Sequence, residues 1–202
     1  MADPVIHVVD DDPGVRRSLR RLLETAGLAV RTYESGAAFI AASAALSVGC
    51  VLVDVRMPGM DGLELQARLK DAFFDLPIIM MTGQGNVLTA VHAMKGGAVD
   101  FLEKPFSDDL LLKTIETALV ARDQDQHRKE IIDAAARVAA LSPRESEVLD
   151  AVLAGRPNKT IAFDLGLSVR TVEVHRARMM ERLGVRQVAE AVRLAVLAHM
   201  AS

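Results

Sequence analysis

Three carboxylates, one hydroxyl and one ammonium stand directly after short apolar runs in the first half of the chain. These residues are Asp10, Asp11, Asp54, Thr82 and Lys104. Clustered carboxylates resist joint ionisation unless a cation lies among them, and Mg²⁺ prefers oxygen ligands. A carboxylate can accept a phosphoryl group as an acyl phosphate, while a hydroxyl and an ammonium bind the added charge. The residue types therefore indicate phosphoryl chemistry, provided that the fold brings them together.

The apolar runs before these residues are typical of buried strands, and helical patterns alternate with them. The expected strands are Val5–Val9, Ala29–Thr32, Cys50–Asp54, Pro77–Met81 and Val99–Leu102. The expected helices cover residues 13–26, 35–43, 61–70 and 87–95, and a fifth begins near residue 107. This order predicts an α/β domain with a doubly wound, five-stranded parallel (βα)5 sheet. Ligand sites in such sheets lie beyond the carboxyl ends of the strands, so the five polar residues are expected in one crevice.

A plainer reading of the first acidic cluster is a solvated turn that caps a helix. Asp12 precedes Pro13, and this pair is typical of an N-cap followed by proline at the first helical position. We assign Asp12 to that structural role. For Asp10 and Asp11, their place in a set with Asp54, Thr82 and Lys104 favours a functional role.

The second half of the chain has an all-α pattern. Residues 121–140 are charge-rich, balanced in sign and free of Gly and Pro, so they predict a helical connector that continues the fifth helix. Ser142 and Glu145 form a capping-box pattern around Pro143. Four helices are expected after residue 141, over residues 143–154, 158–165, 168–183 and 187–200.

Residues 158–183 have the layout of a helix-turn-helix, with Gly166 in the turn. On its second helix the residues expected to face the core are Val172, His175, Met179 and Leu183. The opposite face carries Arg170, Glu173, Val174, Ala177, Arg178 and Glu181. Such a face can read base edges in a major groove, although an ordinary solvated helix would show the same arginines.

The helix expected at residues 87–95 has more apolar positions than one buried stripe requires. Two interpretations stay open at this point. The helix could be alanine-rich and packed tightly on the sheet, or it could present an apolar surface to a second copy of the chain.

Composition bounds the class of protein. The 202 residues include no apolar run long enough to span a bilayer, and the first residues do not form a signal peptide. The single cysteine, Cys50, cannot form an internal disulfide. Residues 1–120 carry 11 Lys and Arg against 16 Asp and Glu, whereas residues 141–202 carry nine against seven. We therefore expect a cytoplasmic protein whose two halves bind different partners.

Four motifs of the first half, in the same order, resemble the receiver domains of two-component response regulators. They are Val8-Val9-Asp10-Asp11, the stretch from Asp54 to Gly62, Thr82-Gly83 and Lys104-Pro105-Phe106. The resemblance implies that Asp54 is the phosphoacceptor and that Asp10, Asp11, Asp54 and the backbone carbonyl of Arg56 bind Mg²⁺. It also implies that Thr82, Phe101 and Lys104 are the residues that sense phosphorylation.

The second half resembles the LuxR/FixJ class of helix-turn-helix domains. The matching stretches begin at Leu141, Asn158 and Ser168. The resemblance implies phosphate contacts from Lys159, Thr160 and Thr171. It implies base contacts from Arg170, Glu173, Val174 and Ala177, with Arg178 on the same face, and dimerisation through residues 187–200. The combined motifs are most similar to the nitrogen-fixation regulators of this class.

We thus expect a receiver domain at residues 1–122, a helical linker at 123–140 and a DNA-binding domain at 141–202. A sensor histidine kinase would phosphorylate Asp54, the protein would dimerise, and the dimer would bind promoter DNA, with RNA polymerase as a further partner. We expect a regulator and not an enzyme. Two alternatives remain: a regulator independent of phosphorylation, with a vestigial acidic pocket, and a Mg²⁺-dependent phosphatase with an aspartate nucleophile.

Overall fold

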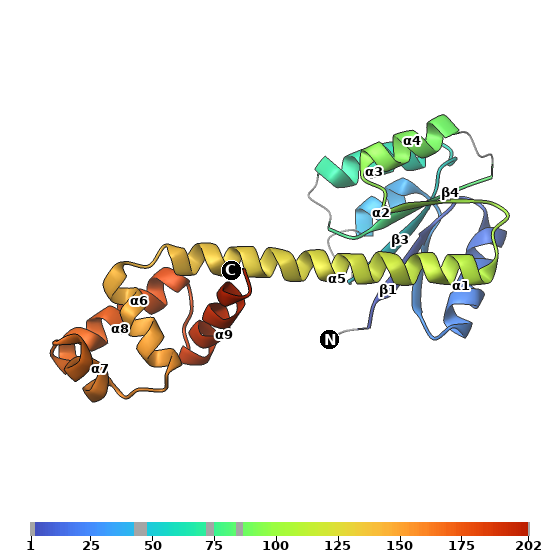
Figure 1. Cartoon of the computed structure of the whole chain (residues 1–202). Helices are drawn as coiled ribbons and strands as arrows, with labels where there is room; N and C mark the ends of the chain where they lie inside the picture. Colours follow the sequence, from blue (N-terminus) through green and yellow to red (C-terminus); the bar gives the residue numbers. More distant parts are fainter. Residues whose placement is uncertain (1–2, 43–47, 72–74, 84–86, 202) are drawn as a thin grey trace. The chain divides into compact units, whose positions relative to one another are not determined.

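The chain forms two compact units in a computed structural model that describes residues 3–42, 48–71, 75–83 and 87–201 (Figure 1). The first unit spans Met1–Asp123 and the second spans Gln124–Ser202. The boundary between them falls within one helix, α5 (Asp108–Ala139). Each unit has a hydrophobic core of its own.

The first unit contains a parallel sheet of five strands in the order β2-β1-β3-β4-β5. Its strands are β1 (Val5–Val9), β2 (Ala29–Tyr33), β3 (Gly49–Asp54), β4 (Ile78–Thr82) and β5 (Asp100–Glu103). Each expected strand is confirmed to within one residue at either end. Because β2 and β3 pair with opposite edges of β1, the sheet has a topological switch point where a crevice opens beyond the strand ends.

Helices cover both faces of this sheet. They are α1 (Pro13–Thr25), α2 (Gly36–Ala42), α3 (Gly62–Asp71), α4 (Val87–Gly96) and the first part of α5. Leu23 of α1 and Leu111 of α5 share one core cluster, whereas Phe39 of α2, Leu65 of α3 and Ala93 of α4 share the other. The doubly wound prediction is therefore confirmed. The end expected for the second helix, Ser43, lies outside the described residues, as does the stretch 84–86.

Asp12 caps α1 as the sequence predicts. Its Oδ1 accepts a hydrogen bond from the backbone N–H of Gly14 at 2.6 Å, and Pro13 occupies the first helical position. This aspartate therefore fixes the direction in which the chain leaves the end of β1.

The second unit contains four helices after α5, namely α6 (Pro143–Leu153), α7 (Asn158–Leu165), α8 (Val169–Leu183) and α9 (Val188–His199). The capping box between Ser142 and Glu145 is present at the start of α6. Gly166 and Gly184 end α7 and α8 with positive φ angles of 67° and 68°, a conformation that glycine adopts at little cost. The expected four-helix arrangement is confirmed.

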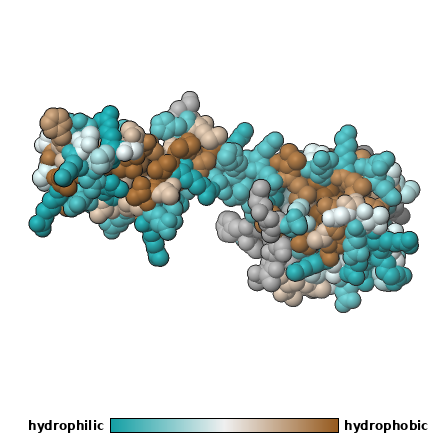
Figure 2. Space-filling view, turned by 90° about the horizontal axis from the view of Figure 1, so that it is seen from below, coloured by the Kyte–Doolittle hydropathy of each residue, from teal (hydrophilic) through white to brown (hydrophobic). Residues whose placement is uncertain are grey.

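Helix α5 is continuous through the segment expected to be a connector, since it runs from Asp108 to Ala139. Its residues from Gln124 onward belong to the second unit. Hydrophilic side chains cover much of the visible face of both units, with apolar areas among them (Figure 2). Among the described residues, no helix has the length and apolar character needed to cross a bilayer.

Candidate functional site

The ammonium of Lys104 joins two carboxylates at the carboxyl end of the sheet. Its Nζ lies 2.7 Å from Oδ2 of Asp10 and 2.7 Å from Oδ1 of Asp54. Asp10 follows β1, Asp54 ends β3, and Lys104 follows β5. The structure thus brings together three of the residues that the sequence singles out, from strands far apart in the chain.

These charged groups are shielded from water. Asp10 is 1% exposed and Asp54 is 7% exposed. Burial raises the pKa of the Asp10 carboxyl, and its hydrogen bonds to Lys104 and to the N–H of Asp12 offset only part of that effect. Burial alone would lower the pKa of Lys104, but its hydrogen bonds to Asp10 and Asp54 raise it overall. The site therefore holds a half-buried cation between two buried carboxylates.

The other oxygens of both carboxylates are bound by the backbone. Oδ1 of Asp10 accepts from the N–H of Asp12 at 2.9 Å, and Oδ2 of Asp54 accepts from the N–H of Arg56 at 2.7 Å. These bonds fix the carboxylates so that their remaining oxygens meet at Lys104. The backbone of Arg56 is thus held beside Asp54 through its N–H, whereas the role expected for this residue uses its carbonyl.

Asp11 differs from the expectation that three acids gather in one crevice. Its side chain is exposed, and among the described residues no three His, Cys, Asp or Glu side chains are close enough to hold a metal ion. The physical reason lies in the turn after β1. Arg16 donates from Nη1 to the carbonyls of Asp10 and Asp11 at 2.6 and 2.9 Å, while Lys104 neutralises the two inner carboxylates.

Thr82 lies on β4, the strand that pairs with β3, and Phe101 lies on β5, the next strand of the sheet. Thr82 ends β4 and is 1% exposed, and its carbonyl accepts the N–H of Lys104 at 2.7 Å. Phe101 is half-buried on β5 and packs on the core cluster formed with α3 and α4. The peptide bond between Lys104 and Pro105 is cis.

Sequence reasoning missed two residues that shape this site. Arg16 fixes the acidic turn by donating to the backbone carbonyls of that turn. The only signal for this role in the sequence is the position of an arginine one turn into the following helix. Gly62 is the second, because a Cβ at this position would lie 2.4 Å from the carbonyl oxygen of Asp54. A glycine eight residues after the central aspartate is the signal that could have identified it.

In the second unit, α7 and α8 form the expected helix-turn-helix. Val172, Met179 and Leu183 of α8 are fully buried, and His175 is half-buried. The opposite face of α8 is exposed, as expected, at Arg170, Glu173, Val174, Ala177, Arg178 and Glu181. Helix α8 therefore presents a continuous polar face with small apolar side chains among the charges, a suitable surface for a major groove.

Comparison with known protein families and relatives decides the class. Residues 6–116 match the response regulator receiver domain, and residues 139–195 match the bacterial regulatory proteins of the luxR family. The transcriptional regulatory protein FixJ of Bradyrhizobium diazoefficiens is 48% identical over 196 residues, 96% of each chain. The chain belongs to the FixJ-like response regulators of the LuxR class. Response regulator protein TmoT of Ectopseudomonas mendocina is 40% identical over 95% of this chain and 88% of its own.

Solved structures agree with this assignment. Full-length FixJ from B. japonicum is 47% identical and covers 99% of both chains with a TM-score of 0.62. The response regulator StyR is 39% identical, with a TM-score of 0.67 over 96% of this chain and 99% of its own. The family consists of transcriptional regulators and not of catalytic enzymes, and its receiver domains generally bind Mg²⁺ at the acidic site.

The phosphate-contacting residues expected of this response regulator lie at helix starts. Lys159 and Thr160 are exposed in the first turn of α7. Thr171 is half-buried, and its hydroxyl lies 2.8 Å from that of Ser168, the N-cap of α8. Arg176, which sequence reasoning did not single out, donates to Oδ1 of Asn158 at 2.6 Å and so fixes the start of α7 against α8.

Helix α4 carries large apolar side chains on its outer surface. Leu88 is 66% exposed, Val91 40% and Met94 47%, whereas Ala93 is fully buried. Tight packing of an alanine-rich helix explains Ala93 but not the three exposed side chains. The surface therefore favours the second interpretation of this helix, a face that a protein partner covers.

Proposed function

We propose that a sensor histidine kinase phosphorylates this response regulator on Asp54. The observation that carries the proposal is the convergence of Asp10 and Asp54 on the ammonium of Lys104, at 2.7 Å from each. In this proposal residues 1–122 are the receiver, residues 123–140 the helical linker and residues 141–202 the DNA-binding domain.

The chemistry is transfer of a phosphoryl group from a histidine nitrogen of the kinase. A carboxylate oxygen of Asp54 forms the new O–P bond as the N–P bond breaks, and the histidine nitrogen keeps the electron pair. The phosphoryl group adds nearly two negative charges beside Lys104. The ammonium then binds a phosphoryl oxygen, and the hydroxyl of Thr82 donates a hydrogen bond to another.

The donor set of the site fits Mg²⁺. Asp10 and Asp54 present carboxylate oxygens that already share the ammonium of Lys104, the backbone N–H of Arg56 binds Asp54, and the side chain of Asp11 is exposed. These four residues are the proposed ligands. When bound, Mg²⁺ would neutralise charge on the incoming phosphoryl group and on the carboxylates.

The proposed output is dimerisation followed by binding to promoter DNA. Recruitment of Thr82 and movement of Phe101 would shift α4 and β5 to a state in which Leu88, Val91 and Met94 are covered by a second copy. In the dimer, α8 would read bases through Arg170, Glu173, Val174, Ala177 and Arg178. Lys159, Thr160 and Thr171 would bind phosphates.

The proposed role is activation of transcription with RNA polymerase as a further partner. The identities of 48% and 45% to FixJ proteins of Bradyrhizobium diazoefficiens and Rhizobium meliloti support nitrogen-fixation genes as targets.

The test is the solution mass of the protein in Mg²⁺, with and without beryllofluoride, which mimics an acyl phosphate. We expect a monomer that becomes a dimer in the wild type and stays a monomer in Asp54→Asn. Dimerisation of Asp54→Asn would show that the mimic acts elsewhere. If a small phosphodonor does not label the wild type, the acidic pocket is vestigial and the regulator is independent of phosphorylation. Turnover of a small phosphate ester would instead favour the phosphatase.

A further inference from the structure

The last turns of α5 and α8 each contain an arginine whose side chain donates a hydrogen bond at the end of the other helix. Arg137 of α5 donates from Nη1 to the carbonyl of Leu183, the last residue of α8, at 3.4 Å. Arg182 of α8 donates from Nη1 to the carbonyl of Ala140, directly after α5, at 3.2 Å. Both contacts lie within the second unit. We call these two arginines and their two carbonyl acceptors the arginine clasp.

The clasp has a physical basis in helix ends. The last carbonyls of a helix lack partners within the helix and carry its negative partial charge, so a cation that donates to them is favourable. Here each helix provides the cation for the other helix. A displacement of either end therefore breaks a contact on both.

Arg182 also connects the clasp to the start of α6. Its Nη1 lies 3.3 Å from Oε2 of Glu145, a carboxylate that is 2% exposed. The same oxygen accepts the N–H of Ser142 at 2.8 Å. Arg182 is thus the cationic partner of a buried acid, and its position is set by the turn that follows α5.

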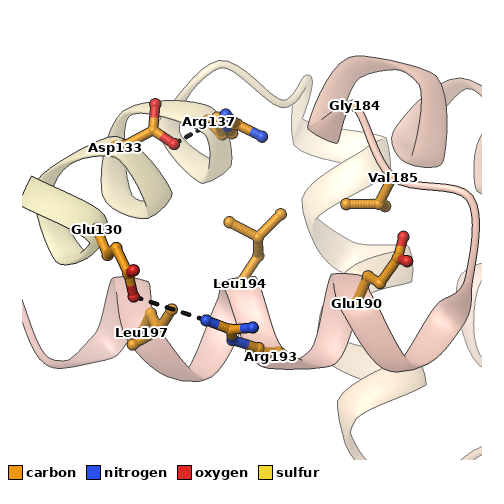
Figure 3. A pocket seen from close by; sticks show the side chains of 9 residues that line it. All are labelled: Glu130, Asp133, Arg137, Gly184, Val185, Glu190, Arg193, Leu194 and Leu197. Atoms are coloured by element: carbon orange, nitrogen blue, oxygen red, sulfur yellow. Dashed lines mark ion pairs between the residues drawn. The ribbon is translucent and has the colours of Figure 1, made fainter. Parts of the chain in front are cut away.

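A groove of about 330 Å³ lies between α5 and α9, and Arg137 of the clasp is one of the residues that line it (Figure 3). Leu194 points from α9 into this space. Ion pairs lie at the edges, with Glu130 3.6 Å from Arg193 and Asp133 2.9 Å from Arg137. Ala134 is buried and Val138 packs on the core. Among the described residues, the two hydrogen bonds of the clasp join the end of α5 to the end of α8, beside the apolar packing of Val138 on the shared core.

We propose that Arg137 and Arg182 are positioning residues that hold α8 to the end of α5, so that a change in α5 alters the DNA-reading face. The first residues of α5, from Asp108, belong to the receiver unit, and the same helix ends at the clasp. The inference rests on the proposed function, since it assigns a route by which phosphorylation reaches α8.

The experiment uses full-length Arg137→Ala and Arg182→Ala proteins in Mg²⁺ and a DNA duplex selected from a random pool by the beryllofluoride-treated wild type. The measured quantity is the ratio of Kd values without and with beryllofluoride. We expect each variant to lower this ratio about fivefold, since each loses a charge-assisted hydrogen bond. Arg144→Ala is the matched control, because the Arg144 side chain is 52% exposed, against 44% for Arg137 and 48% for Arg182, and pairs with Glu147 of its own helix.

Equal weakening of both Kd values would overturn the proposal, because it would indicate a structural role or lost attraction to DNA. Arg137→Lys, which keeps a cationic donor, should restore part of the ratio. Arg137→Lys also provides a test if Arg182→Ala unfolds because Glu145 has lost its cationic partner.

Hydrogen exchange at the amides of Gly184 and Val185, which bond to the last turn of α8, gives a readout that needs no DNA. We expect faster exchange in both alanine variants and no change in Arg144→Ala. If beryllofluoride does not change the Kd of the wild type, the proposed control by phosphorylation is wrong. The exchange rates at Gly184 and Val185 still test whether the arginine clasp holds the end of α8. Unchanged exchange would overturn it.

Discussion

The Nζ atom of Lys104 lies 2.7 Å from Oδ1 of Asp54, although the two residues are 50 positions apart in the chain. The same nitrogen lies 2.7 Å from Asp10, so one ammonium balances two buried carboxylates. We therefore expect any change in the charge of this group of three to alter both the stability of the receiver and the state of Asp54, the proposed phosphoacceptor.

Replacement of Lys104 by Met should destabilise the receiver, because it leaves Asp10 and Asp54 buried without their cation. We expect a loss of about 2 kcal/mol in the free energy of unfolding at neutral pH. Mg²⁺ should restore most of it by taking the place of the ammonium. Tyr33 is the single tyrosine of a chain without tryptophan, so its fluorescence during urea unfolding reports on the receiver. An equal loss with and without Mg²⁺ would contradict the proposed site; exposed Lys70→Met is the control.

Asp10→Asn should have the opposite effect on stability while it abolishes the response to beryllofluoride. Burial raises the pKa of Asp10 above its unfolded value, so the ionised form opposes folding at neutral pH. We expect the variant to be about 1 kcal/mol more stable at pH 7. As pH falls through the raised pKa, the wild type becomes protonated and the difference should shrink. A difference that is constant with pH would show that Asp10 does not titrate in this range.

Gly62→Ala tests how closely the start of α3 must approach Asp54. The new Cβ would lie 2.4 Å from the Asp54 carbonyl oxygen and 3.0 Å from Cα of Val55, and backbone atoms cannot rotate away. We expect a loss of about 3 kcal/mol in urea unfolding followed by Tyr33. Gly83→Ala is the matched control, because a Cβ there meets nothing within 4 Å. A loss below 1 kcal/mol for Gly62→Ala would contradict the packing.

Much of the fold was predictable because buried parallel strands are short continuous apolar runs, and the polar residues after them mark the crevice. The sequence alone therefore places Asp54 and Lys104 on one edge of the sheet. The helix-turn-helix was equally visible, since Val172, Met179 and Leu183 repeat at helical spacing on α8.

The rest depended on contacts without periodicity. Arg16, Arg137 and Arg182 bind backbone carbonyls, which are present at every residue and leave no mark in the sequence. The exposure of Asp11 could not be predicted either, because it depends on the turn that Arg16 stabilises through backbone carbonyls. Sequence patterns located the elements, and the arginines that connect them became visible only in the structure.

Glu145→Ala should destabilise the second unit in a way that depends on pH. The N–H of Ser142 lowers the pKa of Glu145 below its unfolded value. The stabilisation is therefore present above pH 4.5 and is lost as pH falls through the folded pKa. We expect a loss of about 1–2 kcal/mol at pH 7, measured by hydrogen exchange in α6, and a smaller loss below pH 4. The exposed Glu147→Ala should show neither effect; a loss independent of pH would refute the role of the charge.

Lys159 and Arg178 should affect DNA binding in different ways, because Lys159 is expected to bind phosphate and Arg178 lies on the face of α8 that is proposed to read bases. Lys159→Ala should weaken binding to all duplexes about equally and lower the salt dependence by about one counterion. Arg178→Ala should cost about 1–3 kcal/mol on the selected duplex and relax the preference for one base pair.

Both effects can be measured by fluorescence anisotropy, with the selected duplex and single-base variants titrated at several salt concentrations. Arg144→Ala removes one positive charge outside this surface and is the control for net charge. If Arg178→Ala weakens binding to all duplexes alike, Arg178 contacts the DNA backbone. The base contacts are then expected from Arg170, Glu173, Val174 and Ala177. If Lys159→Ala changes base preference, α7 enters the groove, and the assignment of α8 as the recognition helix is wrong.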